Sequence, residues 1–403
     1  MICTLWYTPR SWFAQSNKKV RVRPPVFALP FRHGDRSITT LIDCLRQQKQ
    51  GMIGRYGKSD NAQGVLQVLL TLVPYVLLWW LCMRFGRTSW YVLSGGVLLL
   101  ILFTLRVFAL MHECGHRSLF RSVWLNRWTG FLLGVLSGMP QYVWAQHHNY
   151  HHAHNGNWER YRGPYATLSV DEYAALSSAQ QRFYRHKCSI TAAPLAGFIY
   201  LVLNPRLTWL KGTFGLWAHI AKGKLGRSGL SVRELAASYQ TRFWKNSREY
   251  RAMLWNNLVL LGAWAVMCWW CGAGLFFLVY VLSVSVAGGL GIVLFTVQHN
   301  FEHSYATDCA NWDYDTGAIE GTSFLVLPAW LNWFTANIGY HHIHHLSSSI
   351  PSYRLVACHE EYQHLFPDVA RVKLSEVSGA MKCILWDIRA HRIITLAEYL
   401  RQT

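Results

Sequence analysis

The sequence predicts an all-α integral membrane protein with four transmembrane helices arranged in two hairpins. Hydrophobic residues make up 52% of the 403 residues and charged residues only 15%, whereas soluble proteins carry about 25% charged residues. In addition, four apolar stretches are long enough to cross a hydrocarbon core of about 30 Å, which takes about 20 helical residues. These two observations argue against a soluble enzyme, a disordered or fibrous chain and a disulfide-stapled secreted module.

The four apolar stretches form pairs because the links within each pair are short. The stretches are residues 64–83, 90–110, 252–270 and 275–297. Six residues join the first two stretches, and four residues join the last two. Consecutive helices with such short links lie next to each other, so each pair is predicted to be an antiparallel hairpin.

The basic residues orient these hairpins in the membrane. Of the 39 Lys and Arg residues, 11 precede the first stretch, 18 lie between residues 113 and 251, and 7 follow the fourth stretch. Because cytoplasmic loops are enriched in Lys and Arg, both termini and the middle region are predicted to be cytoplasmic. The chain is then a multi-pass protein, of the cytoplasmic membrane if it is bacterial. Arg106, near the end of the second stretch, is expected to snorkel to the headgroups.

The net charge of +19 fits an anionic membrane surface better than a nucleic acid. The basic residues lie between apolar stretches and form no single cluster, and juxtamembrane basic segments are attracted to anionic lipids. Two shorter apolar stretches, residues 129–144 and 189–203, are broken by prolines. They are expected to be interfacial helices that lie on the membrane surface.

The histidines are the residues that indicate a functional site, because 13 of the 19 fall in three short windows of the sequence. The first window, residues 112–116, reads HECGH. The second, residues 147–154, reads HHNYHHAH. The third has two parts, QHNFEH at residues 298–303 and HHIHH at residues 341–345.

The spacing within the windows suits metal ligands. It is i, i+4 in the first window and i, i+3, i+4 in the other two, which places the imidazoles on one helix face. Neutral imidazole binds Zn, Cu, Fe and Ni, but a zinc site needs only three or four ligands. Eight or more histidines suit two ions with open positions, and iron could use such a pair to activate O₂. Six carboxylates are candidate acceptors for the other ring N–H groups: Glu113, Glu159, Glu302, Asp313, Asp315 and Glu320.

These segments resemble the membrane fatty-acid desaturases, and the Δ12/omega-type acyl-lipid desaturases in particular. The resemblance rests on HECGH, on HHNYHHAHNGNWERYRGPY at residues 147–165, on QHNFEHSYA at 298–306 and on NIGYHHIHHLSSSIPSYRL at 337–355. It runs from about residue 55 to about residue 366 and implies a di-iron enzyme that uses O₂ and two electrons to desaturate an unactivated acyl chain. The partner is then a membrane lipid or another acyl substrate, and the sequence leaves open whether the acyl group is carried by a phospholipid, by CoA or by a carrier protein. The resemblance also implies a cytosolic helical cap that holds the metal site.

The resemblance implies a set of metal ligands when it is carried over by position. Eight of them are His112, His116, His148, His151, His152, His341, His344 and His345. A further ligand comes from the segment after the fourth stretch, where His303 is slightly favoured over His299. Asn337 stands where the family often has Asp. His147, His154 and His342 are additional histidines, for which a structural or solvated role is expected.

The windows and apolar stretches divide the chain into five regions. These are a cytosolic N-terminal segment (1–63), a first transmembrane hairpin (64–111), a cytosolic and interfacial region with the first two histidine windows (112–251), a second hairpin (252–297) and a cytosolic C-terminal region with the third window (298–403). No HPGG motif of the cytochrome b₅ type is present. The electrons are therefore expected from a separate donor of the ferredoxin or cytochrome b₅ type.

Other functions fit part of this pattern. A fatty-acyl or hydrocarbon hydroxylase or ketolase would use the same centre and share the first hydrogen abstraction, so only its product differs. A zinc-dependent membrane hydrolase would need zinc and no O₂. A metal transporter would need polar residues within the spans, where Arg106 is the one charged residue.

Overall fold

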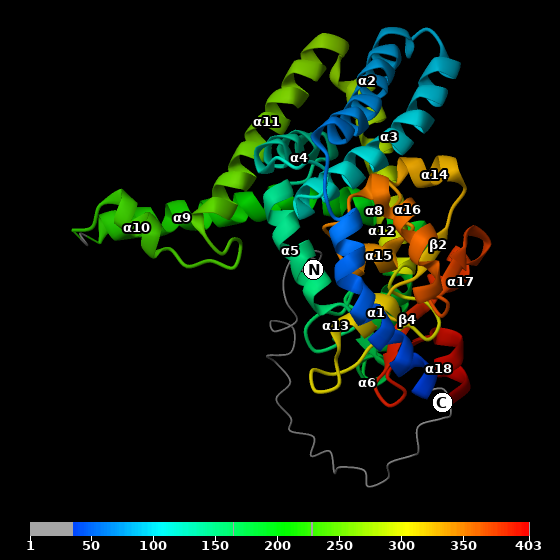
Figure 1. The fold of residues 1–403 in the computed structure, drawn as a ribbon. Coiled ribbons are helices and arrows are strands. Elements are labelled where there is room, and N and C mark those ends of the chain that lie inside the picture. Colours follow the sequence, from blue (N-terminus) through cyan, green and yellow to red (C-terminus); the bar gives the residue numbers. More distant parts are fainter. Residues whose placement is uncertain (1–34, 164, 227–228, 403) are drawn as a thin grey trace.

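The computed structural model describes residues 35–163, 165–226 and 229–402, and it is mostly helical (Figure 1). The first 34 residues of the predicted N-terminal segment lie outside this description. Within the described residues, five helices have the length and composition to cross a membrane, one more than the sequence predicted. The prediction of a helical membrane protein is confirmed.

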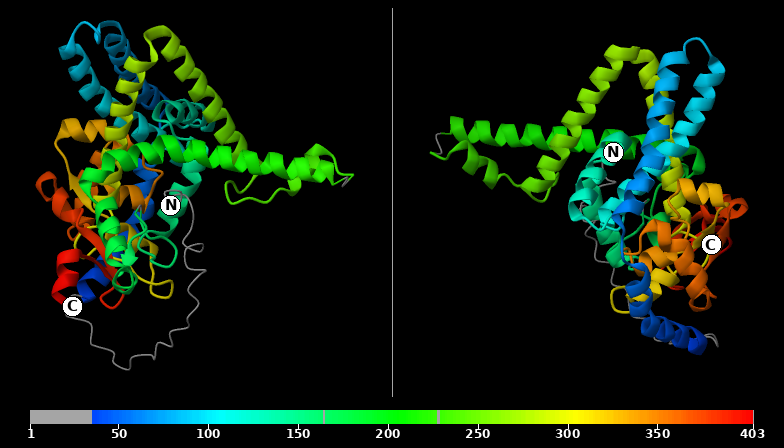
Figure 2. Two further views of the ribbon diagram at one scale, coloured as in Figure 1. Left: turned by 180° about the vertical axis from the view of Figure 1, so that it is seen from behind. Right: turned by 45° about the horizontal axis from the view of Figure 1, so that its top comes forward.

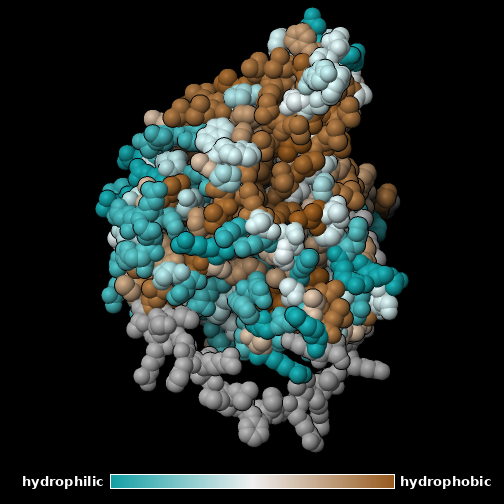
Figure 3. All heavy atoms as spheres, turned by 90° about the vertical axis from the view of Figure 1, so that its right-hand side faces the viewer, coloured by the Kyte–Doolittle hydropathy of each residue, from teal (hydrophilic) through white to brown (hydrophobic). Residues whose placement is uncertain are grey.

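Four of these helices correspond to the predicted hairpins. They are α2 (Asn61–Phe85), α3 (Trp90–His116), α11 (Ser247–Cys271) and α12 (Ala273–Val297). Asp60 caps α2 by accepting a hydrogen bond from Gln63 N at 2.9 Å, and Ser89 caps α3 in the same way. Both hairpins project to the same side of the molecule (Figures 1 and 2). Hydrophobic side chains cover that end, while the opposite end is largely hydrophilic (Figure 3).

Helix α3 extends beyond the apolar stretch and carries the first histidine window. It has 27 residues and ends where Arg117 adopts a left-handed conformation, with φ of 62°. The second window lies on α5 (Gln141–His154), which follows α4 (Val123–Ser137) after a break at Gly138. The expected stretch 129–144 is therefore two short helices rather than one.

Arg106 is buried in this helix packing, and the expectation that it snorkels to the headgroups is wrong. Its side chain is 1% exposed. Nε donates to Thr71 Oγ1 at 2.9 Å, Nη2 donates to Gln67 Oε1 at 2.5 Å, and Nη1 donates to the carbonyl of Trp333. The guanidinium also lies 3.6 Å from the ring centroid of Trp333. These acceptors and the indole face offset the desolvation of the charge.

The fifth candidate span is a composite helix over Ile190–Leu225. It consists of η3 (Ile190–Ala192), α8 (Ala193–Phe198), the π-helical segment η4 (Ile199–Leu203) and α9 (Asn204–Leu225). Pro205 does not end it, because proline fits the first turn of α9. Helix α9 runs crosswise to the hairpins and, with α10 (Val232–Ser238), forms an arm that leaves the body of the molecule (Figures 1 and 2).

Helix α8 packs against α12 through glycines. A Cβ atom on Gly197 would lie 2.3 Å from Gly289 N and 2.4 Å from Gly288 C. The two backbones therefore approach more closely than any side chain would allow, as is common between membrane helices.

The cap below the hairpins contains the remaining helices and two small sheets. The helices are α1 (Asp35–Tyr56), α6 (Val170–Ala174), α7 (Ser178–Lys187), α13 (Tyr314–Ile319), α14 (Ala329–Phe334), α15 (His341–Leu346), α16 (Ser352–Tyr362), α17 (Val377–Ala380) and α18 (Leu396–Gln402). One sheet has the order β1 (Leu168–Ser169), β4 (Cys383–Asp387) and β5 (Arg392–Thr395), and the other pairs β2 (Phe324–Val326) with β3 (Arg371–Lys373). These strands were not predicted. The pairing of β1 with β4 joins the C-terminal region to the segment that follows α5.

Candidate metal centre

Helices α3 and α5 bring the first two histidine windows together. The ring of His112 lies 4.6 Å from that of His148, and the ring of His116 lies 4.5 Å from that of His152, between centroids. Trp144, one turn before His148 on α5, stacks on it at 4.4 Å and donates its indole N–H to Tyr200 Oη at 3.0 Å. This stacking fixes the orientation of the His148 ring. The i, i+4 spacing of Trp144 and His148 was a signal that the sequence analysis did not use.

A tight turn presents the third window, which forms α15. Ala336 and Asn337 adopt left-handed conformations, with φ of 51° and 56°, and asparagine tolerates that region better than most residues. Asn337 Nδ2 then donates to the carbonyl of Ser352 at 3.0 Å. Tyr314 Oη donates to the carbonyl of His345 at 2.7 Å. Asn337 thus stabilises the turn before α15, at the position where the desaturase pattern often has Asp.

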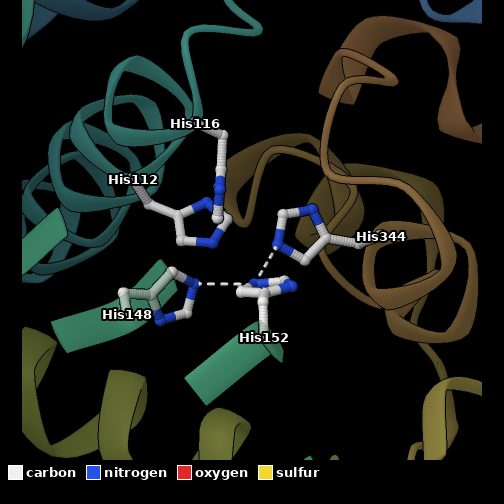
Figure 4. Close-up of side chains that lie close together, drawn as sticks. All are labelled: His112, His116, His148, His152 and His344. Atoms are coloured by element: carbon white, nitrogen blue, oxygen red, sulfur yellow. Dashed lines mark hydrogen bonds between the residues drawn. The ribbon is translucent and has the colours of Figure 1, made fainter. Parts of the chain in front are cut away.

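The histidines gather in two groups, each of which could hold a metal ion. In the first group, one ring nitrogen from each of five histidines lies within 4.8 Å of the others: His112, His116, His148, His152 and His344. Their rings point toward one another from α3, α5 and α15 (Figure 4). The second group brings together His151, His299, His341 and His345 under the same distance limit.

Some ring nitrogens within each group lie close enough together to bind one metal ion. His152 Nε2 lies 3.0 Å from His148 Nε2 and 3.1 Å from His344 Nε2. In the second group, His341 and His299 Nε2 are 2.9 Å apart. Two nitrogens bound at about 2.1 Å are about 3.0 Å apart at a 90° angle but about 3.4 Å apart at the tetrahedral angle. The first group alone offers five imidazoles, more than the three or four ligands that a zinc site needs.

Burial keeps these imidazoles neutral, as metal ligands must be. It lowers the pKa values of His148, His151 and His152 on α5 well below the ordinary value of 6.5. The pKa values of His341, His344 and His345 are lowered in the same way, with neighbouring imidazoles as a second cause. The pKa of His299 falls to about 4. Each ring therefore offers a lone pair at neutral pH.

Of the two candidates after α12, the structure places His299 with the other histidines and His303 outside. His299 is buried, and its Nδ1–H donates to the carbonyl of Gly321 at 3.1 Å, so Nε2 is left to face His341. His303 has a side chain 67% exposed, adopts φ of 66° in the following turn, and lies beside Glu302 and Arg392. The slight preference for His303 is therefore not supported by its position.

The additional histidines lie outside both groups. His342 points away from its neighbours on α15, and its Nε2 pairs with His359 Nδ1 at 3.1 Å. His154 stacks on Tyr150 at 4.2 Å. His147 lines the cavity described below. None of the three residues belongs to either histidine group.

Most of the candidate carboxylates serve other contacts. Asp313 and Asp315 form ion pairs with Arg46 at 2.7 and 3.3 Å, and Glu159 accepts from Cys309 N at 3.1 Å. Glu302 is 72% exposed, and Glu320 follows α13.

Among the six candidate carboxylates, Glu113 lies beside a histidine of the first group. Its Oε1 lies 3.7 Å from His112 Nδ1, while Oε2 accepts hydrogen bonds from Ser352 N at 2.8 Å and from Ser118 Oγ at 3.1 Å. The side chain is 1% exposed. It therefore ties α3 to the start of α16 directly behind the third window.

A large cavity leads to the histidines. Its volume is about 2220 Å³, and it is lined mostly by apolar side chains. His112, His148, His151 and His341 reach its wall, together with Phe108 and Phe295. The cavity runs from these histidines into the membrane-spanning part, where Leu105 and Gly291 line it. Such a space suits a long apolar substrate.

Comparison with known proteins identifies the family. The family model for fatty acid desaturases matches residues 88–375. A fatty acid desaturase of Bacillus subtilis is 30% identical over 343 residues, which cover 85% of this chain and 88% of the relative. An sn-1 oleoyl-lipid 12-desaturase of Anabaena variabilis is 22% identical over 322 residues (79% and 81%), and a fatty acid conjugase of Calendula officinalis is 24% identical over 348 residues (84% of each). The chain therefore belongs to the fatty acid desaturase family of oxidoreductases.

Proposed function

We propose that this protein is an O₂-dependent acyl-lipid desaturase that introduces a C=C bond into an acyl chain, with two iron ions held by the nine grouped histidines. The observation that carries the proposal is the pair of buried, neutral imidazole groups at the wall of a long apolar cavity. The oleoyl-lipid desaturase and the fatty acid conjugase among the relatives support a lipid acyl substrate.

The protein's own contribution is to hold the ligands and to position the chain. When bound, iron would supply the activation of O₂ that cleavage of an unactivated C–H bond requires. Phe295 packs against both His151 and His299, with ring centroids 4.9 and 5.1 Å apart, and Tyr161 packs against His151 at 4.5 Å. These aromatic walls exclude water and hold an acyl chain beside the histidines.

The electrons come from a separate donor in this proposal. Arg117, Arg121 and Arg127 are exposed near the first histidine window, and a basic surface attracts acidic proteins such as ferredoxins. The excess of basic residues outside the hairpins supports cytoplasmic termini and a cytoplasmic cap. A donor on the cytoplasmic side then reaches the same face that holds the histidines.

Gas chromatography with mass spectrometry of total fatty acids from cells expressing the chain tests this function. His344→Ala removes a histidine of the first group, and His303→Ala is the matched control because His303 is exposed and outside both groups. A new olefin with the intact chain and with His303→Ala, but not with His344→Ala, is the expected result. A hydroxy acid in its place would indicate the hydroxylase. No product in aerated cells supplied with a ferredoxin system, together with bound zinc, would indicate the hydrolase.

A further inference from the structure

Trp144 is an aromatic contact shared by two histidines of the first group. Its buried indole stacks on His148, with ring centroids 4.4 Å apart and planes inclined by 16°, and it meets the ring of His112 at 5.6 Å. Within the described part of the chain, the His148 ring forms one hydrogen bond, between its Nε2 and that of His152 (Figure 4). Metal-binding histidines are usually oriented by an acceptor at the other ring nitrogen, but here the stacked indole takes that role.

A hydrogen bond to a distant segment holds this indole in place. Trp144 Nε1 donates to Tyr200 Oη at 3.0 Å, although 56 positions separate the two residues in the chain. Both side chains line the large cavity, so the bond joins α5 to the composite helix at the cavity wall. A buried indole N–H needs an acceptor. Without the hydroxyl, the donor would be left unpaired and the indole would lose the contact that fixes its tilt.

Tyr200 belongs to η4, the π-helical segment of the composite helix. Such turns are rare and occur frequently at functional sites. Arg206, in the first turn of α9, supports this one, because its Nη1 donates to the carbonyl of Leu201 at 3.2 Å and to that of Val202 at 3.1 Å. The guanidinium is buried, which strengthens these bonds. They hold η4 in the conformation that presents Tyr200 to Trp144.

The guanidinium of Arg206 also holds the start of α5. Its Nη1 donates to the carbonyl of Gly138, at the break between α4 and α5, and its Nε donates to Asn257 Oδ1 of α11 at 2.6 Å. Trp144 follows in the first turn of α5. One buried side chain therefore fixes the segment that carries Trp144 relative to the segment that carries Tyr200, and the hydrogen bond between them is preorganised.

We propose that Tyr200 is a positioning residue of the metal centre, whose hydroxyl holds the Trp144 indole against His148 so that this imidazole faces the metal position of the first group. The inference rests on the proposed function, because it assumes that the first group binds a metal ion. It assigns a task to the composite helix, which contributes no histidine to either group. The effect should be confined to one ion, because His112 and His148, which contact Trp144, both belong to the first group.

Iron binding by the purified full-length protein is the first test. Tyr200→Phe removes the hydroxyl and keeps the ring, and Tyr142→Phe is the matched control on α5, outside the cavity lining. Metal-free protein is titrated anaerobically with Fe(II) in competition with a chelator. The affinity for one of the two ions is expected to fall about two- to tenfold in Tyr200→Phe, the range for loss of one hydrogen bond, and to stay the same in Tyr142→Phe. Wild-type affinity in Tyr200→Phe would overturn the proposal.

Mössbauer spectroscopy separates positioning from a general loss of stability. In the reduced protein loaded with isotopically enriched iron, Tyr200→Phe is expected to change the quadrupole splitting of one iron and to leave the other unchanged. Tyr142→Phe should leave both unchanged. A change at both irons, together with a lower midpoint temperature of thermal unfolding, would indicate that Tyr200 only stabilises the fold and would contradict the proposal.

A double-mutant cycle tests whether Tyr200 acts through Trp144. Trp144→Phe keeps a ring that can stack on His148 but has no N–H donor. The double variant Trp144→Phe/Tyr200→Phe is expected to bind iron no more weakly than Trp144→Phe alone, because both changes remove the same hydrogen bond. Additive losses of affinity would show that the two residues act independently and would overturn the proposed route.

Ultraviolet resonance Raman spectroscopy of the metal-free protein detects the hydrogen bond without metal or product. The indole signal of Trp144 is the difference between the spectra of the intact chain and of Trp144→Phe. Tyr200→Phe is expected to shift this signal toward weaker hydrogen bonding, and Tyr142→Phe is not. If the intact chain binds iron but forms no olefin, the proposed desaturation fails while the positioning role stands on the iron affinities. If the indole signal does not respond to Tyr200→Phe, the positioning role fails whatever the activity.

Discussion

At the residue scale, the centre depends on which atom each histidine presents. The Gly321 carbonyl accepts the Nδ1–H of His299, so that Nε2 faces His341, whereas four residues later His303 has a left-handed backbone conformation and an exposed side chain. The sequence contains both histidines at plausible spacing. The path of the backbone after α12 decides which of the two histidines joins the second group. No local sequence pattern predicts that path. The spacing predicted that the imidazoles of each window share one helix face, and the eight histidines implied by the resemblance lie in the two groups together with His299.

This difference gives a paired prediction. His299→Ala should lower the iron content and reduce desaturation by at least about 100-fold, because ligand loss should exceed the 10–100-fold effect typical of residues that merely support a ligand. His303→Ala should retain wild-type iron and activity. Inductively coupled plasma mass spectrometry measures the iron content, and gas chromatography measures the desaturated product. A greater loss of iron and product in His303→Ala than in His299→Ala would contradict the assignment of His299 as the ligand.

Protonation of the same histidine predicts the pH response of the metal-free protein. The pKa of His299 is about 4 in the folded chain and about 6.5 when unfolded, so the unfolded state takes up a proton first. The stability from this group is complete above pH 6.5 and is lost progressively as the pH falls toward 4. The midpoint temperature of thermal unfolding of chelator-treated protein should therefore decrease as the pH is lowered from 7 to 5. A flat profile over that range would contradict neutral burial.

At the element scale, a single helix can cross the membrane at one end and carry histidines of the centre at the other. Helix α3 serves as a membrane span and as the carrier of the first window, which the apolar pattern alone ended six residues early. The composite helix over Ile190–Leu225 is apolar enough to resemble a span, yet its α9 part leaves the body crosswise to the hairpins. Composition predicts the existence of such helices, but their direction follows from contacts such as that of Arg206 with Asn257.

The contact between α8 and α12 predicts one strongly destabilising substitution. Gly197→Val should destabilise the protein by about 1–3 kcal/mol or more, because a Cβ there would lie 2.3 Å from Gly289 N. Gly262→Ala on α11 is the control, since its Cβ would meet no atom within 4 Å. Thermal unfolding in detergent compares the two. Similar midpoints for both variants would show that α8 does not pack on α12 in this way.

Helix α12 also predicts where the cavity can be shortened. Gly291 lines the cavity, and a Cβ there would approach nothing closer than Leu105 Cδ1 at 4.0 Å. Gly291→Leu should fold normally, fill the membrane-side end and lower activity on the longest accepted chain at least about tenfold, as a misfitting methylene does in an apolar pocket. Chain-length profiles by gas chromatography, with Gly291→Ala as control, test this. An unchanged profile would place the acyl chain elsewhere.

At the scale of the whole molecule, the hairpins and the cap assign the two ends of the protein to different environments. The hydrophobic end and the hydrophilic end are separated in Figure 3. The helical membrane architecture could be predicted from composition and span length. The short strands that pair β1 with β4, and the burial of Arg106 against Trp333, could not, because they depend on contacts between segments far apart in the chain.

The orientation is tested by labelling with a membrane-impermeant maleimide. Thr88→Cys, in the link between α2 and α3, should react in intact spheroplasts, whereas the exposed Cys309 of the cap should react only after lysis. Peptide mass spectrometry distinguishes the two sites. Labelling of Cys309 from outside would reverse the proposed cytoplasmic position of the cap.

The central claim is that the two histidine groups hold two iron ions, and metal analysis of the purified protein tests it most directly. The intact chain, purified aerobically after expression in iron-replete medium, should contain two irons per chain and show the Mössbauer signature of a coupled pair. His344→Ala should lose iron while His303→Ala keeps it. Stoichiometric zinc without iron in the intact, folded chain would contradict the di-iron account.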